Sequence, residues 1–168
     1  MRPLEKDYAP FYKNYIENIE GENILEILNK QNQLTQNVLN SFSEHKGSYS
    51  YAPGKWTVKE VVGHMSDTER VFAYRALCIA RGDKQPLPGF EQDDYVKEGN
   101  FNKRNLFDLN YDYRLLRESN LLLFKSFDDK MLARRGTASG YEVTVNALLF
   151  MIAGHSFHHI EILKTRYL

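Results

Sequence analysis

The sequence predicts an all-α protein, a four-helix bundle with one long crossover loop, and three observations support this. Four segments carry apolar residues at steps of three and four, which is the period of one face of an α-helix. Alternating strand patterns are almost absent between them. The chain of 168 residues suffices for one continuous core and hardly for two, so we predict a single domain over residues 1–168. Four amphipathic helices bury their apolar faces together as a bundle.

The apolar periodicity and the turn residues between the segments place the helices. We expect them at about residues 22–45, 57–81, 105–127 and 145–167. Residues 1–21 contain Pro3, Pro10 and several tyrosines, and are expected to form an irregular lead-in. Gly47 and the stretch SYSYAPGK end the first helix, because glycine and proline interrupt helical backbone.

The second helix has a clear start signal. Thr57 and Glu60 have the spacing of a capping box, in which the Thr hydroxyl accepts a first-turn N–H and the Glu carboxylate returns to the Thr N–H. Residues 83–103, with two prolines and two glycines, predict a long loop that crosses between the second and third helices. The stretch ARRGTASGYEVT predicts a turn-rich connection with a short extended piece before the last helix.

The overall charge excludes two classes of partner. The 22 basic side chains balance 22 acidic ones, so no net field attracts nucleic acid or an anionic membrane. No apolar run approaches the roughly 20 residues needed to span a bilayer. The N-terminal sequence lacks the apolar segment of a signal peptide, and the single cysteine, Cys78, indicates a reducing compartment. We therefore expect a soluble cytoplasmic protein that binds neither nucleic acid nor membrane.

The last helix carries histidines where its pattern calls for apolar residues. The stretch GHSFHHIEIL, residues 154–163, holds three histidines in an apolar run. On a helical wheel at about 100° per residue, His155 and His159 lie on the apolar side, one turn apart, and His158 points toward the polar side. Two imidazoles at positions i and i+4 can bind one metal ion from a single helix.

A transition metal needs at least one further protein ligand, and two other histidines are available. His64 lies on the flank of the core face of the second helix, whereas His45 sits at a helix end beside Lys46 and is expected to be solvated. The predicted ligand set is therefore His64, His155 and His159. The competing interpretation is that these histidines are hydrogen-bonded core residues without a metal, although burying imidazoles without partners is unfavourable.

Other candidate site residues are less specific. Glu69 lies in the apolar face of the second helix, where it can act as a general base, orient a ligand imidazole, or, as we favour, form a buried pair with an Arg or Tyr. Arg75 can bind an anionic substrate group or, as we favour, extend to solvent along the bundle edge. Trp56 precedes the helix cap and is expected to pack there as a hydrophobic staple. Tyr141 and Glu142 are candidates to reach the metal end of the bundle.

The segments that carry these residues resemble a known family. Two stretches, KWTVKEVVGHMSDTERVFAYRAL and RRGTASGYEVTVNALLFMIAGHSFHHIEILKTRYL, are similar to the DinB/YfiT-like superfamily of metal-dependent enzymes, and the order of helices and loops extends the likeness to nearly the whole chain. The resemblance implies an up-down-down-up four-helix bundle. It also implies that His64, His155 and His159 bind a divalent metal, most often nickel or zinc, and that His158 lies beside the site or at the surface.

The resemblance also bears on activity. Three neutral imidazoles leave an open coordination position, which is typical of catalytic sites. A metal there can activate water for hydrolysis or a thiolate for S-transfer, and similar proteins include transferases and isomerases that use low-molecular-weight thiols. We therefore expect a metal-dependent hydrolase or small-thiol S-transferase that acts on a small-molecule substrate. The alternative is a non-catalytic metal-binding or dimerisation module with a stress-related role.

Two further expectations follow. A fourth protein ligand, such as Glu69 or His158, would indicate a structural metal site instead of a catalytic one. The resemblance also implies a homodimer. The surfaces we suspect for it are the apolar face of the first helix and the tyrosine-rich lead-in.

Overall fold

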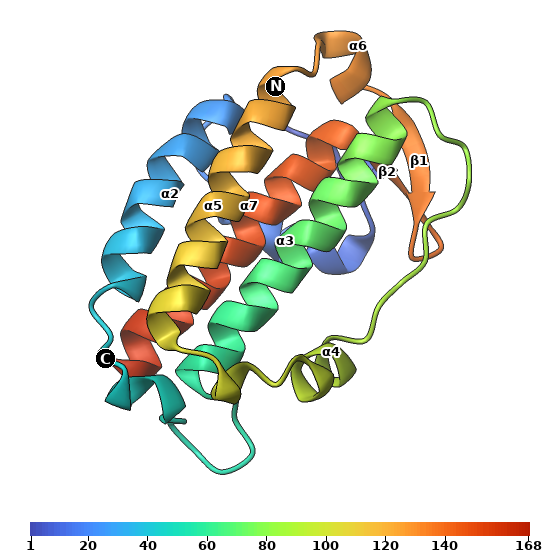
Figure 1. The fold of residues 1–168 in the computed structure, drawn as a ribbon. Helices are drawn as coiled ribbons and strands as arrows, with labels where there is room; N and C mark the ends of the chain where they lie inside the picture. The colour runs from blue at the N-terminus through green and yellow to red at the C-terminus, as the bar shows by residue number, and fades with distance from the viewer.

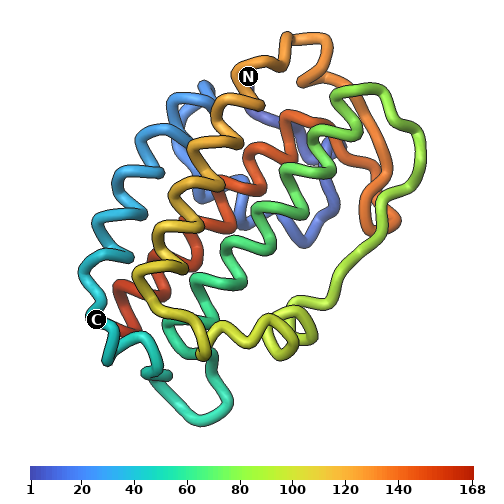
Figure 2. The backbone as a smooth tube through the Cα atoms, in the orientation of Figure 1, coloured from blue at the N-terminus to red at the C-terminus, as the bar shows by residue number.

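The computed structural model describes residues 1–168 and contains four long helices that form a bundle (Figure 1). Their bounds are α2 Ile24–Leu39, α3 Val58–Ala80, α5 Leu106–Lys125 and α7 Val145–Ile162. α3 and α5 run in one direction, and α2 and α7 run in the other (Figure 2). The expected all-α bundle and its up-down-down-up order are confirmed. None of the helices is long and apolar enough to cross a membrane.

Short polar side chains start each long helix. The predicted capping box is confirmed: the Glu60 N–H donates to the Thr57 hydroxyl over 3.2 Å, and the Thr57 N–H donates to the Glu60 carboxylate over 2.8 Å. Asn23, Asn105 and Thr144 cap α2, α5 and α7 through side chains that accept backbone N–H groups. These caps fix where each helix begins, and so fix the height of each functional side chain in the bundle.

α2 ends earlier than expected. Its last residue is Leu39, and residues His45–Ser48 form a separate 3₁₀ turn, η3. The Ser41 hydroxyl donates to the carbonyl oxygen of Val38 over 2.7 Å. Such a bond offers the backbone an alternative to the helical ladder, which accounts for the early end.

The N-terminal lead-in is more ordered than expected. It contains the short turns η1 Glu5–Asp7 and η2 Pro10–Tyr12 and the helix α1 Lys13–Glu17. Ile16 and Ile19 are buried, and α1 packs against α7. Ile16 lies within α1 and Ile19 lies two residues beyond its end, so one buried side chain anchors the helix. A segment this short shows no recognisable periodicity.

Gly154 allows α1 to approach α7. A Cβ atom at this position would lie 2.2 Å from the backbone oxygen of Tyr15. A backbone atom cannot move aside as easily as the end of a flexible side chain. We predict that Gly154→Ala lowers the free energy of unfolding by about 1–3 kcal/mol, the usual effect of overpacking. Urea denaturation followed by circular dichroism measures this change. The control is Gly89→Ala, whose Cβ would meet Ser139 at an ordinary 3.5 Å, and equal losses in both variants would contradict the steric argument.

The crossover between α3 and α5 is not a simple loop. The expected loop over residues 83–103 contains the helix α4 Gln92–Gly99 and the turn η4 Phe101–Lys103. Val96 is the single buried residue of α4, so this helix lacks the periodic stripe that predicts the others. The crossover returns the chain to the end of the bundle where α3 begins, and α5 therefore runs parallel to α3 (Figure 1).

A short hairpin precedes α7, as the turn-rich stretch predicts. After α6 Asp129–Leu132, strands β1 Arg135–Ala138 and β2 Tyr141–Thr144 pair antiparallel. The turn residues Ser139 and Gly140 have positive φ angles of 53° and 82°, typical of a two-residue type I′ turn. Leu87 of the crossover forms a β-bridge with Ala138, so the hairpin also anchors the crossover.

The core consists of two apolar clusters with a polar layer between them. On each long helix the buried apolar residues lie toward the two ends, and polar residues lie in the middle. On α7, Ala153 belongs to one cluster and Ile160 to the other, and the intervening positions include His155 and His159. The polar layer, as we use the term, comprises Gln31, Thr35, His64, Thr68, Glu69, Tyr113, Arg117, Asn120, His155, Ser156 and His159. The chemically active side chains therefore lie at mid-height in the bundle.

Candidate metal centre

Three histidines from two helices meet in the polar layer. His64 lies on the second turn of α3, and His155 and His159 lie one turn apart on α7. Nε2 of His155 is 2.9 Å from Nε2 of His64 and 3.1 Å from Nε2 of His159, and one ligand atom from each ring lies within 4.8 Å of the others. The three residues are only 2%, 6% and 8% exposed. The structure thus brings together the three histidines that the sequence selects.

The triad has the donor atoms and the protonation state that a divalent metal ion requires. Burial lowers the pKa of His64 to about 4, and burial with the neighbouring imidazoles lowers the pKa values of His155 and His159 well below the ordinary range. All three rings are therefore neutral at neutral pH, and neutral imidazole is the form that binds metals. Zn–N bonds of about 2.0–2.1 Å put neighbouring ligand nitrogens about 2.9–3.4 Å apart. The two short Nε2 separations match that range.

Hydroxyl and aromatic side chains hold the imidazoles in place. The Thr68 hydroxyl lies 3.5 Å from Nδ1 of His64, the ring nitrogen that does not face His155. The Tyr15 ring meets the His155 ring edge-on, with centroids 5.8 Å apart and planes at 89°. Contacts of this kind fix the orientation of each ring and so direct Nε2 toward the shared centre.

Trp56 contributes to the site in a way that the sequence did not predict. The centroid of its ring lies 4.7 Å from that of His64. The hydroxyl of Tyr167, in the π-helical turn η5 Leu163–Tyr167, donates to the Trp56 carbonyl over 2.6 Å. The C-terminal turn therefore holds Trp56 against the triad. We expected a staple at the helix start, and the available signal for a site role was the position of this single tryptophan shortly before His64.

The other two histidines lie outside the triad. His158 is exposed, and its ring centroid lies 5.3 Å from that of Tyr15 and 5.0 Å from that of His159. His45 is exposed in the turn η3. Neither residue supplies a fourth ligand atom to the group of three.

An ion pair occupies another part of the polar layer. Nε and Nη2 of Arg117 donate to the two carboxylate oxygens of Glu69 over 2.8 Å each, and Asn120 donates to the same carboxylate over 3.1 Å. Nη2 of Arg117 also donates to the Tyr113 hydroxyl, which hydrogen-bonds to Ser156. Burial opposes the charge of Arg117, but the Glu69 carboxylate outweighs it and raises the arginine's pKa. Glu69 thus forms the buried pair that we favoured, and the structure does not bring it to the triad.

Arg75 does not extend to solvent, so the interpretation that we favoured for it is wrong. Its side chain is buried beneath the crossover. It donates to the carbonyl of Pro88 over 2.6 Å and to the Ser139 hydroxyl over 3.0 Å. The crossover therefore covers the position that would otherwise be the bundle edge, and Arg75 ties the crossover to the hairpin.

Tyr141 and Glu142 lie on β2 and not at the triad. The hairpin joins the N-terminal end of α7, whereas His155 and His159 lie in the C-terminal half of that helix. The Tyr141 ring packs edge-on against Phe11, with centroids 5.4 Å apart. The structure does not bring either residue to the histidines.

A cavity of about 260 Å³ reaches the triad at His159. Its lining is mostly aromatic and aliphatic, with one basic and one acidic side chain. The side chains that line it include Tyr51, Lys55, Trp56, Val61, Asp93, His159, Ile162 and Tyr167. A small molecule can therefore reach His159 between the start of α3, α4 and the C-terminal turn.

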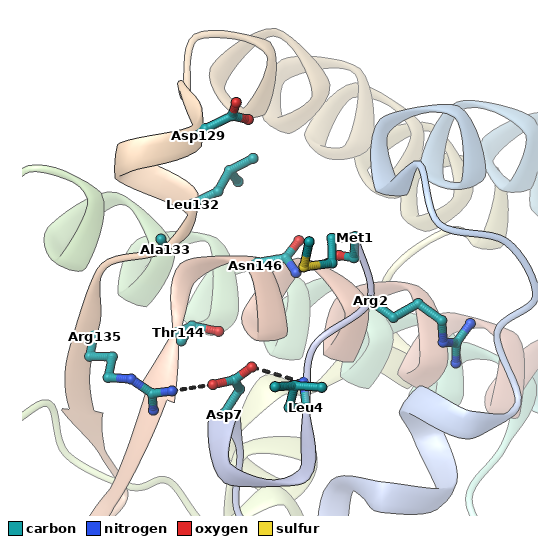
Figure 3. A pocket seen from close by; sticks show the side chains of 10 residues that line it. All are labelled: Met1, Arg2, Leu4, Asp7, Asp129, Leu132, Ala133, Arg135, Thr144 and Asn146. Carbon is teal, nitrogen blue, oxygen red and sulfur yellow. Dashed lines mark hydrogen bonds and ion pairs between the residues drawn. The ribbon is translucent and has the colours of Figure 1, made fainter.

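A larger cavity, of about 570 Å³, lies elsewhere, between the lead-in and the start of α7 (Figure 3). Two of its charged side chains, Asp7 and Arg2, are engaged within the chain. Asp7 pairs with Arg135 and accepts the Leu4 N–H, and Arg2 donates to the Ile16 carbonyl over 2.7 Å. No histidine or cysteine lines this cavity, so the metal-ligating side chains of the candidate site lie elsewhere.

Comparison with known proteins agrees with the geometry. The sequence profile of the DinB superfamily matches residues 27–163, a range that includes all three histidines of the triad. The chain belongs to the DinB superfamily. The resemblance in the two quoted stretches is thereby confirmed. No curated protein matches the sequence.

Solved structures show the same DinB-type fold. YfiT from Bacillus subtilis, described as a probable metal-dependent hydrolase with an unusual four-helix bundle topology, superposes with a TM-score of 0.74 at 15% identity, over 98% of this chain and 92% of YfiT. A mycothiol-dependent maleylpyruvate isomerase superposes with a TM-score of 0.72 at 13% identity, over 87% of this chain. The match spans 61% of the length of the isomerase. A histidine-to-alanine mutant of the same enzyme superposes with a TM-score of 0.71. At these identities the likeness shows the fold alone.

Proposed function

We propose that this DinB-superfamily protein is a metal-dependent enzyme acting on a small molecule, with His64, His155 and His159 holding one divalent ion, nickel or zinc. The convergence of three buried, neutral imidazoles beside an accessible cavity carries the proposal. When bound, the ion supplies Lewis-acid activation of water, for hydrolysis, or of a small thiol, for S-transfer. The descriptions of the structural relatives name a hydrolase and a thiol-dependent isomerase.

The surroundings of the triad favour an enzyme over a structural metal site. The group contains three protein donors, because Glu69 is held by Arg117 and His158 is exposed. Three ligands leave a position for substrate, which is the pattern of catalytic sites. The Trp56 ring shields one side of the centre from water, and Lys55 lies in the cavity wall, where it can orient an anionic part of a substrate.

Metal uptake and turnover test the proposal together. The protein is purified without a nickel column, stripped with a chelator and reloaded with zinc or nickel. We expect about one equivalent of metal by elemental mass spectrometry, and turnover that depends on it. Hydrolysis of a p-nitrophenyl ester without added thiol indicates the hydrolase, whereas conjugation of glutathione to an electrophile indicates S-transfer. Metal uptake without either activity supports the non-catalytic module, and failure to take up metal overturns the proposal.

Trp56 provides a second readout of metal binding. It is the single tryptophan of the chain, and its ring lies beside His64. Ni²⁺ is paramagnetic and is expected to quench Trp56 fluorescence strongly, saturating at one equivalent, whereas Zn²⁺ is not paramagnetic and serves as the control. His64→Ala is expected to remove the stoichiometric quench. Quenching that persists unchanged in that variant would place the bound ion elsewhere.

We also propose that the protein works in the cytoplasm as a homodimer. The single Cys78 suits a reducing compartment. The surfaces that the sequence suggested for a dimer are largely used within the chain, because Ile16 of the lead-in and Leu28 and Leu39 of α2 are buried. A dimer therefore needs a different surface.

A further inference from the structure

α5 carries apolar side chains on its outer face as well as on its inner face. The inner face supplies the core residues Leu109, Tyr113 and Leu121. On the outer face the exposed fractions are 70% for Phe107, 45% for Tyr111, 45% for Leu115 and 70% for Leu122. At about 100° per residue these four side chains fall within one sector of roughly 80°. We call them the α5 outer stripe.

No segment of the chain covers the outer stripe. α5 lies between α2 and α3 at the front of the bundle, and nothing crosses its outer face (Figures 1 and 2). A helix with apolar residues on both faces is normally buried on both. Single exposed apolar residues need no explanation, but a contiguous stripe marks an interaction site.

The charges along the stripe are arranged symmetrically. Nε of Arg114 lies 3.6 Å from Oε1 of Glu118, and the Arg114 guanidinium lies 4.9 Å from the centre of the Tyr111 ring. Arg114 precedes Leu116 by two residues, and Glu118 follows it by two. Opposite charges placed equally on either side of one point are self-complementary, since the same helix turned end to end presents Glu118 to Arg114 and Arg114 to Glu118.

Resting on the homodimer proposed above, we infer that the α5 outer stripe pairs with the same stripe of a second copy of this chain, antiparallel, about a two-fold axis at the height of Leu116. Such an axis places residues at equal distances before and after it opposite each other. Leu115 then meets the partner's Leu115 near the axis. Tyr111, five residues before the axis, lies close to the partner's Leu122, six residues after it. Each apolar contact that lies away from the two-fold axis has a symmetry-related copy on the other side of it.

The same pairing satisfies the charges. Arg114 and Glu118 form a cluster of alternating sign with the partner's Arg114 and the partner's Glu118. Phe107 faces the partner's Lys125, a favourable cation–π arrangement. A parallel pair would instead put like charges at the same height, which disfavours it. None of the residues that line the cavity beside His159 belongs to α5, so the pairing leaves that cavity open.

Charge reversal tests the inference. Sedimentation equilibrium of the full chain over a range of concentrations at low salt is expected to show a reversible dimer. Arg114→Glu and Glu118→Arg should each raise the dimer Kd about 10-fold or more, because each sets like charges against each other. The double variant restores both pairs and should return Kd to within about 3-fold of the wild type. A monomer at all concentrations, or a dimer indifferent to both reversals, overturns the inference.

Crosslinking tests the register. Leu115→Cys places two thiols near the axis, and mild oxidation with diamide should join them as the diamide is reduced. Leu34→Cys is the matched control, because Leu34 is also exposed but lies on α2. We expect no crosslink in the Leu34→Cys variant, and none through Cys78 in the wild type. Crosslinking of Leu34→Cys but not of Leu115→Cys would assign the interface to α2. Metal content of these variants is measured in parallel, so failure of the dimer and failure of the metal site are distinguished.

Discussion

Replacing Arg117 with methionine is expected to lower the free energy of unfolding by about 3–5 kcal/mol, because the change leaves a buried carboxylate without its counter-charge. The Glu69 side chain is 3% exposed and that of Arg117 is fully buried at 0%. In the variant, Asn120 still donates to Glu69, but neither charge-assisted bond from the guanidinium remains. Urea denaturation followed by circular dichroism at neutral pH measures the loss.

Two controls separate the buried charge from the lost side-chain packing. Arg70→Met removes an exposed arginine that pairs with Asp112, and it is expected to cost less than about 1 kcal/mol. The double variant Glu69→Gln/Arg117→Met removes both buried charges and is expected to recover most of the loss. If the double variant is as unstable as Arg117→Met, the ion pair is not the source of the effect.

The second large effect concerns the metal. His64→Ala and His159→Ala are each expected to weaken zinc or nickel binding by more than about 100-fold, because a lost ligand costs more than a lost hydrogen-bond partner of a ligand. Competition with a chromophoric chelator measures the affinity, and elemental mass spectrometry measures the stoichiometry. The wild type should also gain stability on metal addition, by about 4 kcal/mol at a thousand-fold excess over Kd.

His158→Ala is the matched control for these variants. The residue is adjacent to His159 in sequence but exposed, and its replacement is expected to leave stoichiometry and affinity nearly unchanged. A loss of metal from His158→Ala equal to that from His159→Ala would mean that the surface imidazole is a ligand. Retention of metal by His64→Ala would mean that α3 does not take part.

The sequence was sufficient for the parts of the structure that repeat a pattern. Long amphipathic segments predict the four helices, because each must bury one face. The Thr57–Glu60 box is a local signal and needs no tertiary information. His155 and His159 share a face by helical geometry alone. Their meeting with His64 is less local. The position of His64 on the flank of the core face of its helix selected it, and the resemblance to a family supported that choice.

The sequence was insufficient where a residue's role depends on a distant segment. Arg75 is buried because the crossover folds over it, and no spacing within α3 reveals that cover. Trp56 reaches His64 partly because Tyr167, far along the chain, holds its carbonyl. α4 carries too little apolar periodicity to be recognised, and Val96 is buried only because the crossover returns across the start of α3.

The position of α7 also sets the order in which the protein can mature. It is the last long helix of the chain, yet α1, α2 and α3 all pack against it. While the ribosome is still making it, the earlier helices expose apolar faces that have no partner, and nascent chains of this kind depend on protection from aggregation. The contact between His64 and His155 likewise forms only after a residue 91 positions further along the chain has been made. A product truncated before residue 145 therefore lacks the helix on which α1, α2 and α3 pack, and is expected to be a target for proteolysis.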